Sequence, residues 1–210
     1  MKKYLGYIVF CILSFSSVGQ KEFRFRNFSI NDGLSQSSVT SLVQDKNDAL
    51  WVGTQDGLNC FNGKEFEVFT ADKTEGLESS YIKCSLIDDE GNLWFGTNNG
   101  LTIYSQKSEQ FKTFFVSKGE IIQIEDLALG QNGDLWVATS ESGLFRFNMN
   151  SLKFESFKYK VPSRKTTHVK VTDDGIVVVA TVGGGLYFYN SEKDRTVEIN
   201  STQTPFSSVN

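Results

Sequence analysis

Short stretches in which apolar and polar residues alternate recur along most of the chain, separated by polar turns that contain glycine. One phrase, residues 50–54 around Trp51, returns around Trp94, around Trp136 and, without the tryptophan, around Val178. The steps between these four positions are 43, 42 and 42 residues. Alternation with a period of two is typical of half-buried strands. A repeat of this length made of short strands predicts an all-β fold, a β-propeller in which each repeat forms one four-stranded antiparallel blade.

Four strand-like segments can be assigned to each repeat. In the first repeat the opening strand is expected at 39–45, the second holds the tryptophan, the third begins at Gly57, and the fourth follows a Phe-x-x-Phe pattern from Phe66. The glycine that recurs in the turn after the opening strand suits a backbone with positive φ. The equivalent opening strands are expected at 82–88, 124–130 and 166–172.

The tryptophans are interpreted as structural residues rather than as ligand contacts. Each lies on a short strand, where a large ring is expected to pack between neighbouring sheets. The small residue two positions further on shares its face and would let adjacent blades approach closely. The residues assigned to this repeat core are Trp51, Gly53, Trp94, Gly96, Trp136 and Ala138.

The propeller repeats are expected to fill residues 20–210 as about four repeats. A ring of seven blades would need roughly 290 residues, and an array that stops within a repeat leaves an apolar face uncovered. The pattern therefore favours an incomplete propeller within a longer product over a self-contained ring of four blades. The expected blade units are about 23–69, 77–115, 120–158 and 162–200, with the start of a fifth at 206–210.

The N-terminal residues differ from the repeats. Lys2 and Lys3 precede an apolar run over 4–15, which is followed by small and polar residues. This order predicts a secretory signal peptide over residues 1–19, because the run is shorter than the ~20 residues that a membrane span needs. We therefore expect an exported protein, periplasmic or extracytoplasmic. A Phe-x-x-Phe pattern at Phe25 and Phe28 predicts that the mature chain opens on an outer strand.

Export would leave Cys60 and Cys84 in an oxidising compartment. Cys84 alternates with Ile82 and Leu86 on the inward face of a predicted strand. Two separate buried thiols are the expectation, and a disulfide between them is the alternative.

Charge and composition give little support for catalysis or metal binding. The net charge of −4 and the pI of about 5.1 provide no basic footprint, so nucleic acid is not an expected partner. The single histidine, His168, lies in an opening strand, away from any context for a triad, a zinc site or a phosphoacceptor. The acidic turns at 88–90 and 173–174 are positions where aspartate serves turn geometry. No metal and no cofactor are expected.

The loops at one end of the blades are the candidate ligand-binding surface. The turns between second and third strands should share a rim with the connections from each fourth strand to the next blade. Polar, amide-rich side chains beside aromatic residues suit sugar hydroxyls, which need paired donors and acceptors, although ordinary solvated turns are the alternative. The candidate ligand-binding residues are Gln55, Asp56, Asn98, Asn99 and Glu141.

Several of these stretches resemble a known repeat family. Residues 28–39 and 50–59, and more closely residues 88–101, resemble the two-component regulator propeller repeat. The fourth repeat departs most, because Val178 replaces the tryptophan and residues 183–185 lengthen a turn with three glycines.

The resemblance implies a periplasmic region of a sensor histidine kinase, often a hybrid one, that responds to a glycan or another small ligand. Such proteins typically add further blades, an immunoglobulin-like domain, a membrane span and a kinase. This chain would then reach the membrane and its signalling partners only through segments other than these residues, and would not itself be an enzyme. A secreted propeller scaffold without signalling, or part of a propeller lyase or hydrolase, are the alternative interpretations.

Overall fold

The computed structural model describes residues 25–191 and 193–199. The regular structure of this part consists of one 3-10 turn, η1 (Ile30–Asp32), and strands in four antiparallel four-stranded sheets. The expected signal peptide, 1–19, and the expected start of a fifth unit, 206–210, lie outside the described residues. None of the helices found there has the length and apolar character required to cross a bilayer.

Each sheet is one blade, and its strands are neighbours in the order in which they follow along the chain. Blade 1 contains β1 (Val39–Gln44), β2 (Leu50–Thr54), β3 (Gly57–Phe61) and β4 (Phe66–Phe69). Blade 2 contains β5 (Ile82–Ile87), β6 (Leu93–Thr97), β7 (Gly100–Ser105) and β8 (Gln110–Phe114). Blade 3 contains β9 (Ile124–Leu129), β10 (Leu135–Thr139), β11 (Gly143–Asn148) and β12 (Lys153–Ser156). Blade 4 contains β13 (Thr166–Val171), β14 (Ile176–Thr181), β15 (Gly185–Asn190) and β16 (Arg195–Ile199).

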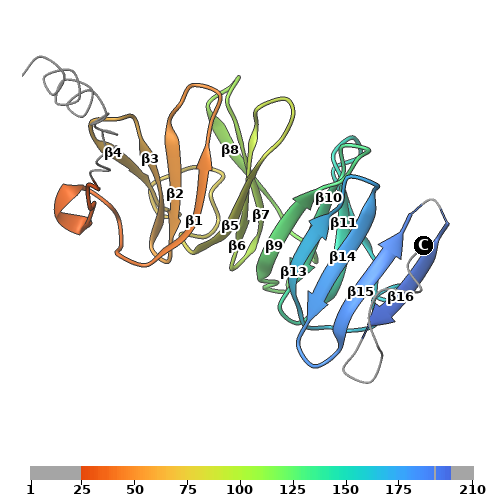
Figure 1. Ribbon diagram of the computed structural model, residues 1–210. Coiled ribbons are helices and arrows are strands. Elements are labelled where there is room, and N and C mark those ends of the chain that lie inside the picture. Colours follow the sequence, from red (N-terminus) through yellow and green to blue (C-terminus); the bar gives the residue numbers. More distant parts are fainter. Residues whose placement is uncertain (1–24, 192, 200–210) are drawn as a thin grey trace, which may run out of the picture.

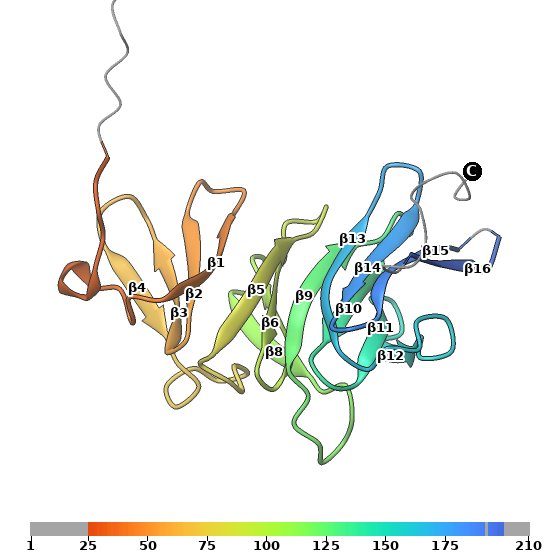
Figure 2. The same ribbon diagram turned by 60° about the horizontal axis from the view of Figure 1, so that its bottom comes forward.

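The blades stand side by side in an arc that follows the sequence from blade 1 to blade 4 (Figure 1, Figure 2). Their first strands form one inner row, in which β1 contacts β5, β5 contacts β9, and β9 contacts β13. Blades 1 and 4 lie at opposite ends of the arc. The described sheets therefore form an open, incomplete propeller, as the repeat pattern predicts.

An aspartate connects the first turn of a blade to its tryptophan in blades 1 and 2. Asp45 directly follows β1, and its Oδ1 accepts hydrogen bonds from the backbone N–H groups of Asn47 (2.8 Å) and Ala49 (3.0 Å). Its Oδ2 accepts the indole Nε1–H of Trp51 at 2.9 Å. One buried carboxylate thus closes the turn and fixes the orientation of the ring, because buried donors need partners.

The tryptophan rings fill the space between successive blades. Trp51 and Trp94 are each 2% exposed. The ring of Trp51 lies 4.7 Å from that of Tyr104 in blade 2, and the ring of Trp94 lies 5.6 Å from that of Phe147 in blade 3. These separations are in the range at which aromatic pairs attract beyond simple area burial.

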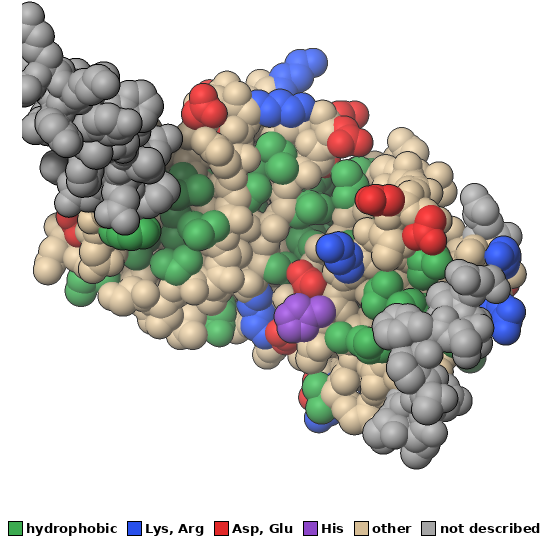
Figure 3. Space-filling view, in the orientation of Figure 1, with side chains coloured by type: hydrophobic (Ala, Val, Ile, Leu, Met, Phe, Trp, Pro, Cys, Tyr) green, Lys and Arg blue, Asp and Glu red, His purple; other side chains and the backbone are tan. Residues whose placement is uncertain are grey.

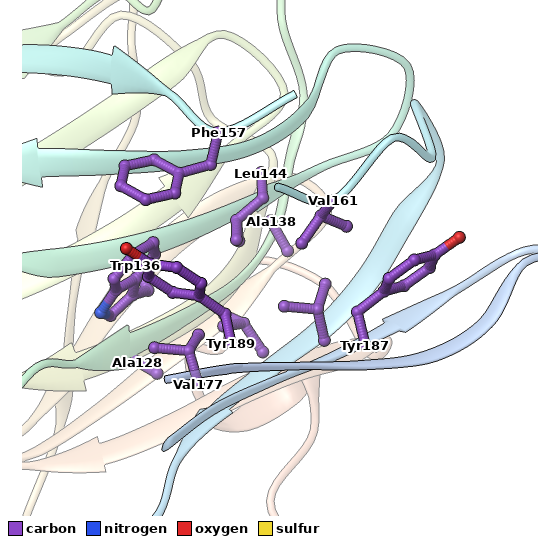
Figure 4. Close-up of a cluster of buried hydrophobic side chains, with 11 residues drawn as sticks. Ala128, Trp136, Ala138, Leu144, Phe157, Val161, Val177, Tyr187 and Tyr189 are labelled. Atoms are coloured by element: carbon purple, nitrogen blue, oxygen red, sulfur yellow. The ribbon is translucent and has the colours of Figure 1, made fainter. Parts of the chain in front are cut away.

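The same arrangement continues between blades 3 and 4 (Figure 4). Trp136 is 5% exposed, and its ring lies 4.7 Å from Phe157 and 5.9 Å from Tyr189 of blade 4. Val177 and Val179 of β14 complete this cluster from the side of blade 4. The cluster therefore joins two sheets into one apolar core, although blade 4 has no tryptophan of its own.

The small residues after the tryptophans lie where blades come closest. A Cβ added at Gly53 would lie 2.7 Å from Cγ2 of Ile82 in blade 2. A Cβ added at Gly96 would lie 2.6 Å from Cγ2 of Ile124 in blade 3. Carbon atoms cannot approach so closely, so these two interfaces exist in their present form because the positions have no side chain.

The first strand of each described blade has a β-bulge near its start, where it pairs with the second strand. The register skips one residue, which leaves Thr40, Lys83, Glu125 and Thr167 as the extra residues. Lys83 Nζ lies 2.5 Å from Glu125 Oε1, so two of these residues form an ion pair between blades 2 and 3. His168 follows in β13 and is exposed at the molecular surface next to acidic side chains (Figure 3).

The outer strand expected from Phe25 and Phe28 is not formed in the described residues. Residues 25–29 have irregular backbone and belong to none of the four sheets. The ring of Phe28 nevertheless packs 4.9 Å from Phe61 and 5.6 Å from Phe66. The segment thus covers part of blade 1 without joining a sheet.

The two cysteines of the described residues are free thiols on different blades, as expected for separate thiols. Cys84, in β5, is buried in the core between blades 2 and 3. Cys60, in β3, is only half-buried, although the sequence pattern predicts burial. Burial raises the pKa of the Cys60 thiol to about 11, and the carboxylates of Asp45 and Glu67 add to the effect.

Candidate functional site

The turns between second and third strands and the connections between blades lie on one rim of the array. In blade 1, Val39 at the start of β1 pairs with Thr54 at the end of β2, and Leu58 of β3 pairs with Phe69 at the end of β4. The start of the first strand and the ends of the second and fourth therefore share one end. We call this end the loop rim, and the opposite end, with the other turns of each blade, the turn rim.

A threonine at the end of each repeated phrase holds the loop-rim turn. Thr97 Oγ1 donates to the carbonyl of Gly100 at 3.0 Å and accepts the backbone N–H of Asn99 at 3.0 Å. Thr54 and Thr139 make the equivalent donations at 2.9 and 2.7 Å. Sequence reasoning assigned these residues no role, although their fixed place in the repeat was a visible indication of one.

Backbone hydrogen bonds attach the connecting loops that enter blades 3 and 4 to the blade before each of them. Gly143 N–H, in the turn of blade 3, donates to the carbonyl of Arg164 at 2.8 Å. Gly100 N–H, in the turn of blade 2, donates to the carbonyl of Ile122 at 3.3 Å. Loops that enter successive blades are thus anchored on the same rim.

A groove of about 530 Å³ lies on the loop rim between the loops that enter blades 3 and 4. We call it the rim groove. Phe145 and Ile122 form part of its apolar lining, and Glu120 and Arg164 contribute charged groups. Tyr159 also lines it and is 86% exposed.

Charged side chains form one wall of the rim groove and are held there by polar contacts. Arg164 Nε donates to the backbone carbonyl of Glu141 at 3.2 Å. Lys165 Nζ lies 3.5 Å from Glu141 Oε1, an exposed ion pair. Lys158, from the same connecting loop, places its Nζ 5.0 Å from the ring centroid of Tyr159. The wall therefore combines an aromatic face with cations that can donate hydrogen bonds.

The candidate ligand-binding residues lie on the loop rim but not together. Glu141 contacts Arg164 at the edge of the rim groove. Gln55 and Asp56 are exposed in the turn of blade 1, and Asn98 and Asn99 are half-buried in the turn of blade 2. None of these four lines the rim groove.

The residues that sequence reasoning missed belong to the connection between β12 and β13. Lys158, Tyr159 and Arg164 lie in this segment, which has no counterpart in the repeated phrase. The sequence signal that could have identified this connection is its difference from the repeat, with basic residues on both sides of a tyrosine. Within the ranges that the structure describes, no group of three or more acidic, histidine or cysteine side chains is placed to hold a metal ion.

Comparisons with known proteins agree with this architecture. Residues 33–56 and 76–99 match the model of the two component regulator propeller family. These two stretches, in blades 1 and 2, match two-component regulator propeller repeats. A segment of 63 residues is 49% identical to Histidine kinase P4 of Formosa agariphila, which corresponds to 30% of this chain and 5% of that protein.

Solved structures share the fold of these propeller repeats at low sequence identity. One is named as the extracellular domain of a hybrid two component system of B. thetaiotaomicron, with a TM-score of 0.73, 22% identity and coverage of 85% of this chain and 26% of that one. Another is a streptogramin B lyase, with a TM-score of 0.63, 11% identity and coverage of 79% and 55%. The chain therefore spans a small part of the relatives that are named as signalling proteins, and the lyase likeness concerns the fold.

Proposed function

We propose that this chain is the ligand-sensing propeller region of an extracytoplasmic two-component sensor, and that an oligosaccharide or a similar small polar ligand binds in its rim groove. The propeller repeats and the signalling proteins among the relatives support the sensor role. The observation that carries the ligand site is the exposed Tyr159 beside charged side chains in a concave surface of about 530 Å³.

The chemistry of the rim groove suits a sugar. An aromatic face such as that of Tyr159 can stack on the apolar C–H face of a pyranose ring. Glu120 and Ser142 offer acceptors for ring hydroxyls, and Arg164 offers donors. A few polar groups on an apolar wall are the usual composition of a specific small-molecule site.

Ligand binding in the rim groove would act on the arrangement of the blades. The groove is lined from the loop that enters blade 3 and from the loop that enters blade 4. A ligand that contacts both loops would favour one relative position of these blades, and so shift the population of a downstream state. The kinase, the membrane span and further blades would belong to other segments, since this chain covers 5% of the kinase relative.

The test compares two sets of loop-rim variants by isothermal titration with a neutral oligosaccharide, cellohexaose, and an acidic one, oligogalacturonate. We expect Tyr159→Ala and Arg164→Ala to weaken binding at least tenfold, because each removes a group that lines the groove. Gln55→Ala, an exposed residue of blade 1, is the matched control and should bind as the unaltered chain does.

Two outcomes would count against this proposal. If Gln55→Ala and Asn99→Ala abolish binding while Tyr159→Ala does not, the ligand lies on the turns of blades 1 and 2 instead. If neither oligosaccharide binds the chain, the proposed ligand class is wrong, and a screen of other small polar molecules replaces it.

A second candidate function, an interaction scaffold, is favoured by exposed apolar side chains on the two end blades. Leu42 of β1 is 60% exposed and Leu186 of β15 is 39% exposed. Apolar side chains are visible on the surface of blade 1 in Figure 3. Sedimentation velocity separates the two functions, because a scaffold of this kind self-associates or captures a partner without any oligosaccharide.

A further inference from the structure

Blade 3 lacks a carboxylate that blades 1 and 2 both possess. Asp45 and Asp88 lie six residues before the tryptophans of their blades, and each accepts the indole N–H, from Trp51 at 2.9 Å and from Trp94 at 2.8 Å. Gly130 occupies the equivalent position in blade 3. It has no side chain with which to accept the indole N–H of the third tryptophan.

Two donors of blade 3 are consequently left without their usual acceptor. Trp136 is 5% exposed, and within the described ranges its Nε1–H makes no hydrogen bond. In blades 1 and 2 the aspartate also accepts the backbone N–H of Ala49 (3.0 Å) or Asn92 (2.8 Å), two residues before the tryptophan. Asp134 occupies this position in blade 3. Gly130 has no carboxylate that could accept the backbone N–H of Asp134.

Arg146 adds a third donor that the other blades do not have. It pairs with Trp136 across β10 and β11, where blades 1 and 2 have Cys60 and Ile103. Its Nε is buried without a hydrogen-bond partner, and the nearest carboxylate oxygen, Asp134 Oδ2, lies 3.8 Å away. A buried N–H without an acceptor costs free energy, so an acceptor placed here would be bound favourably.

These donors face a cavity of about 90 Å³ on the turn rim, lined among others by Gly130, Trp136 and Arg146. The volume exceeds the roughly 30 Å³ share of one water molecule. Blade 4 has no such mismatch, because it lost both partners: Val178 replaces the tryptophan and Thr172 replaces the aspartate. Of the described blades, blade 3 alone keeps the donor and lacks the acceptor.

We propose that this cavity, the blade 3 carboxylate site, binds a small carboxylate anion of the size of formate or acetate. Its oxygens accept hydrogen bonds from Trp136 Nε1, the backbone N–H of Asp134 and Arg146 Nε, and so replace the missing side chain. The neighbouring Asp134 does not prevent this. The same kind of site in blade 2 holds the carboxylate of Asp88 beside Asp89 and Glu90, and without an arginine at the Arg146 position.

The first experiment measures the melting temperature of the full chain in sodium acetate, sodium formate and sodium chloride at equal ionic strength. We expect a saturable rise with acetate and formate beyond that with chloride, because a ligand that binds only the folded state stabilises it. The midpoint should lie in the millimolar range, since so few atoms limit the affinity. Isothermal titration with acetate gives the Kd directly.

Gly130→Asp supplies the missing carboxylate from the chain itself. Gly130 does not have positive φ, so an aspartate can adopt its backbone conformation, and a Cβ there would lie 3.2 Å from Trp136 Nε1. We expect the acetate response to disappear, with affinity at least tenfold weaker. Asn47→Asp is the matched control: it adds the same charge at an exposed position of the equivalent turn in blade 1, away from the cavity, and should keep the response.

Four results would overturn the blade 3 carboxylate site. Acetate and formate could stabilise the chain no more than chloride does, or Gly130→Asp could respond to acetate as fully as the unaltered chain. Should Gly130→Asp fail to fold, Trp136→Phe removes the indole N–H together with part of the ring, and undiminished acetate binding by that variant has the same consequence. A crystal grown in acetate that holds only water in the cavity also excludes the site.

Discussion

Single side-chain volumes set how closely neighbouring blades approach. Gly96 faces Ile124 of blade 3, with no room for a Cβ between them. In the next interface Ala138 takes the place of the glycine, and Thr166 takes the place of the isoleucine. The two positions change in opposite directions: alanine is larger than glycine, and threonine is smaller than isoleucine. The total volume at the interface is therefore nearly kept, as close packing requires.

This pairing predicts a non-additive response to substitution. Gly96→Ala should lower the free energy of unfolding by about 1–3 kcal/mol, because the new Cβ would lie 2.6 Å from Cγ2 of Ile124 and would also crowd Cys84 in its own blade. Ile124→Ala should also destabilise, since Ile124 is fully buried. The double variant should lose at least about 1 kcal/mol less than the sum, because Ile124→Ala removes the methyl group that the new Cβ would meet.

Urea denaturation of the four proteins measures this cycle. Strict additivity would show that the two positions do not share one space, and the volume argument would then be wrong. Ala138→Gly is a useful control, because it only creates a small cavity and should destabilise regardless of what happens at Gly96.

The repeat pattern predicts the strands but not the loops that connect the blades. The inner strand of blade 2 is expected at 82–88 and is found at Ile82–Ile87, since alternation and turn residues act locally. Tyr159 and Arg164, in contrast, line the rim groove from a connection that follows no repeat. Loops carry binding residues on a regular scaffold, and their spatial neighbours come from other blades.

The two strand cysteines give a prediction at this scale. Burial raises the pKa of Cys60 from its usual 9.0 to about 11, so its thiolate fraction at pH 8 should be about a hundredfold lower than for a free thiol. Alkylation of Cys60 by iodoacetamide should be correspondingly slow. Cys84, buried between blades 2 and 3, should react far more slowly still until the chain unfolds in urea.

Peptide mapping by mass spectrometry distinguishes the two sites. The raised pKa of Cys60 also means that the folded state holds the thiol proton more tightly than the unfolded state. Its contribution to stability is therefore complete below pH 9.0 and is lost as the pH rises toward about 11. A disulfide between the two cysteines, seen as a mass change on reduction, would contradict the structure.

The whole array is an arc whose middle and end blades have different surroundings. Blade 2 has neighbours on both faces, and Leu93 and Phe95 of β6 are fully buried. In blade 4, Val177 and Val179 of β14 face blade 3, and Leu186 in the adjacent β15 is 39% exposed. Repeat arrays derive stability from each interface with a neighbour, so the end blade should open more readily.

Hydrogen exchange followed by mass spectrometry tests this difference. Backbone amides of β14 should exchange at least about tenfold faster than those of β6, because local opening of blade 4 breaks one interface instead of two. Equal protection of β6 and β14 would mean that the outer face of blade 4 is covered in solution, by residues outside the described part or by a second molecule.

The sequence by itself determined the blades, because period-two alternation, turn glycines and a phrase repeated every 42 or 43 residues act within one repeat. It also contained the Asp–Trp spacing that makes Gly130 an exception. Only the tertiary structure decided what meets across blades: Gly96 against Ile124, the rim groove between two loops, and the cavity beside Trp136 that blades 3 and 4 both line. Such contacts join residues of different repeats, and their fit depends on the stacking of sheets, which no local pattern encodes.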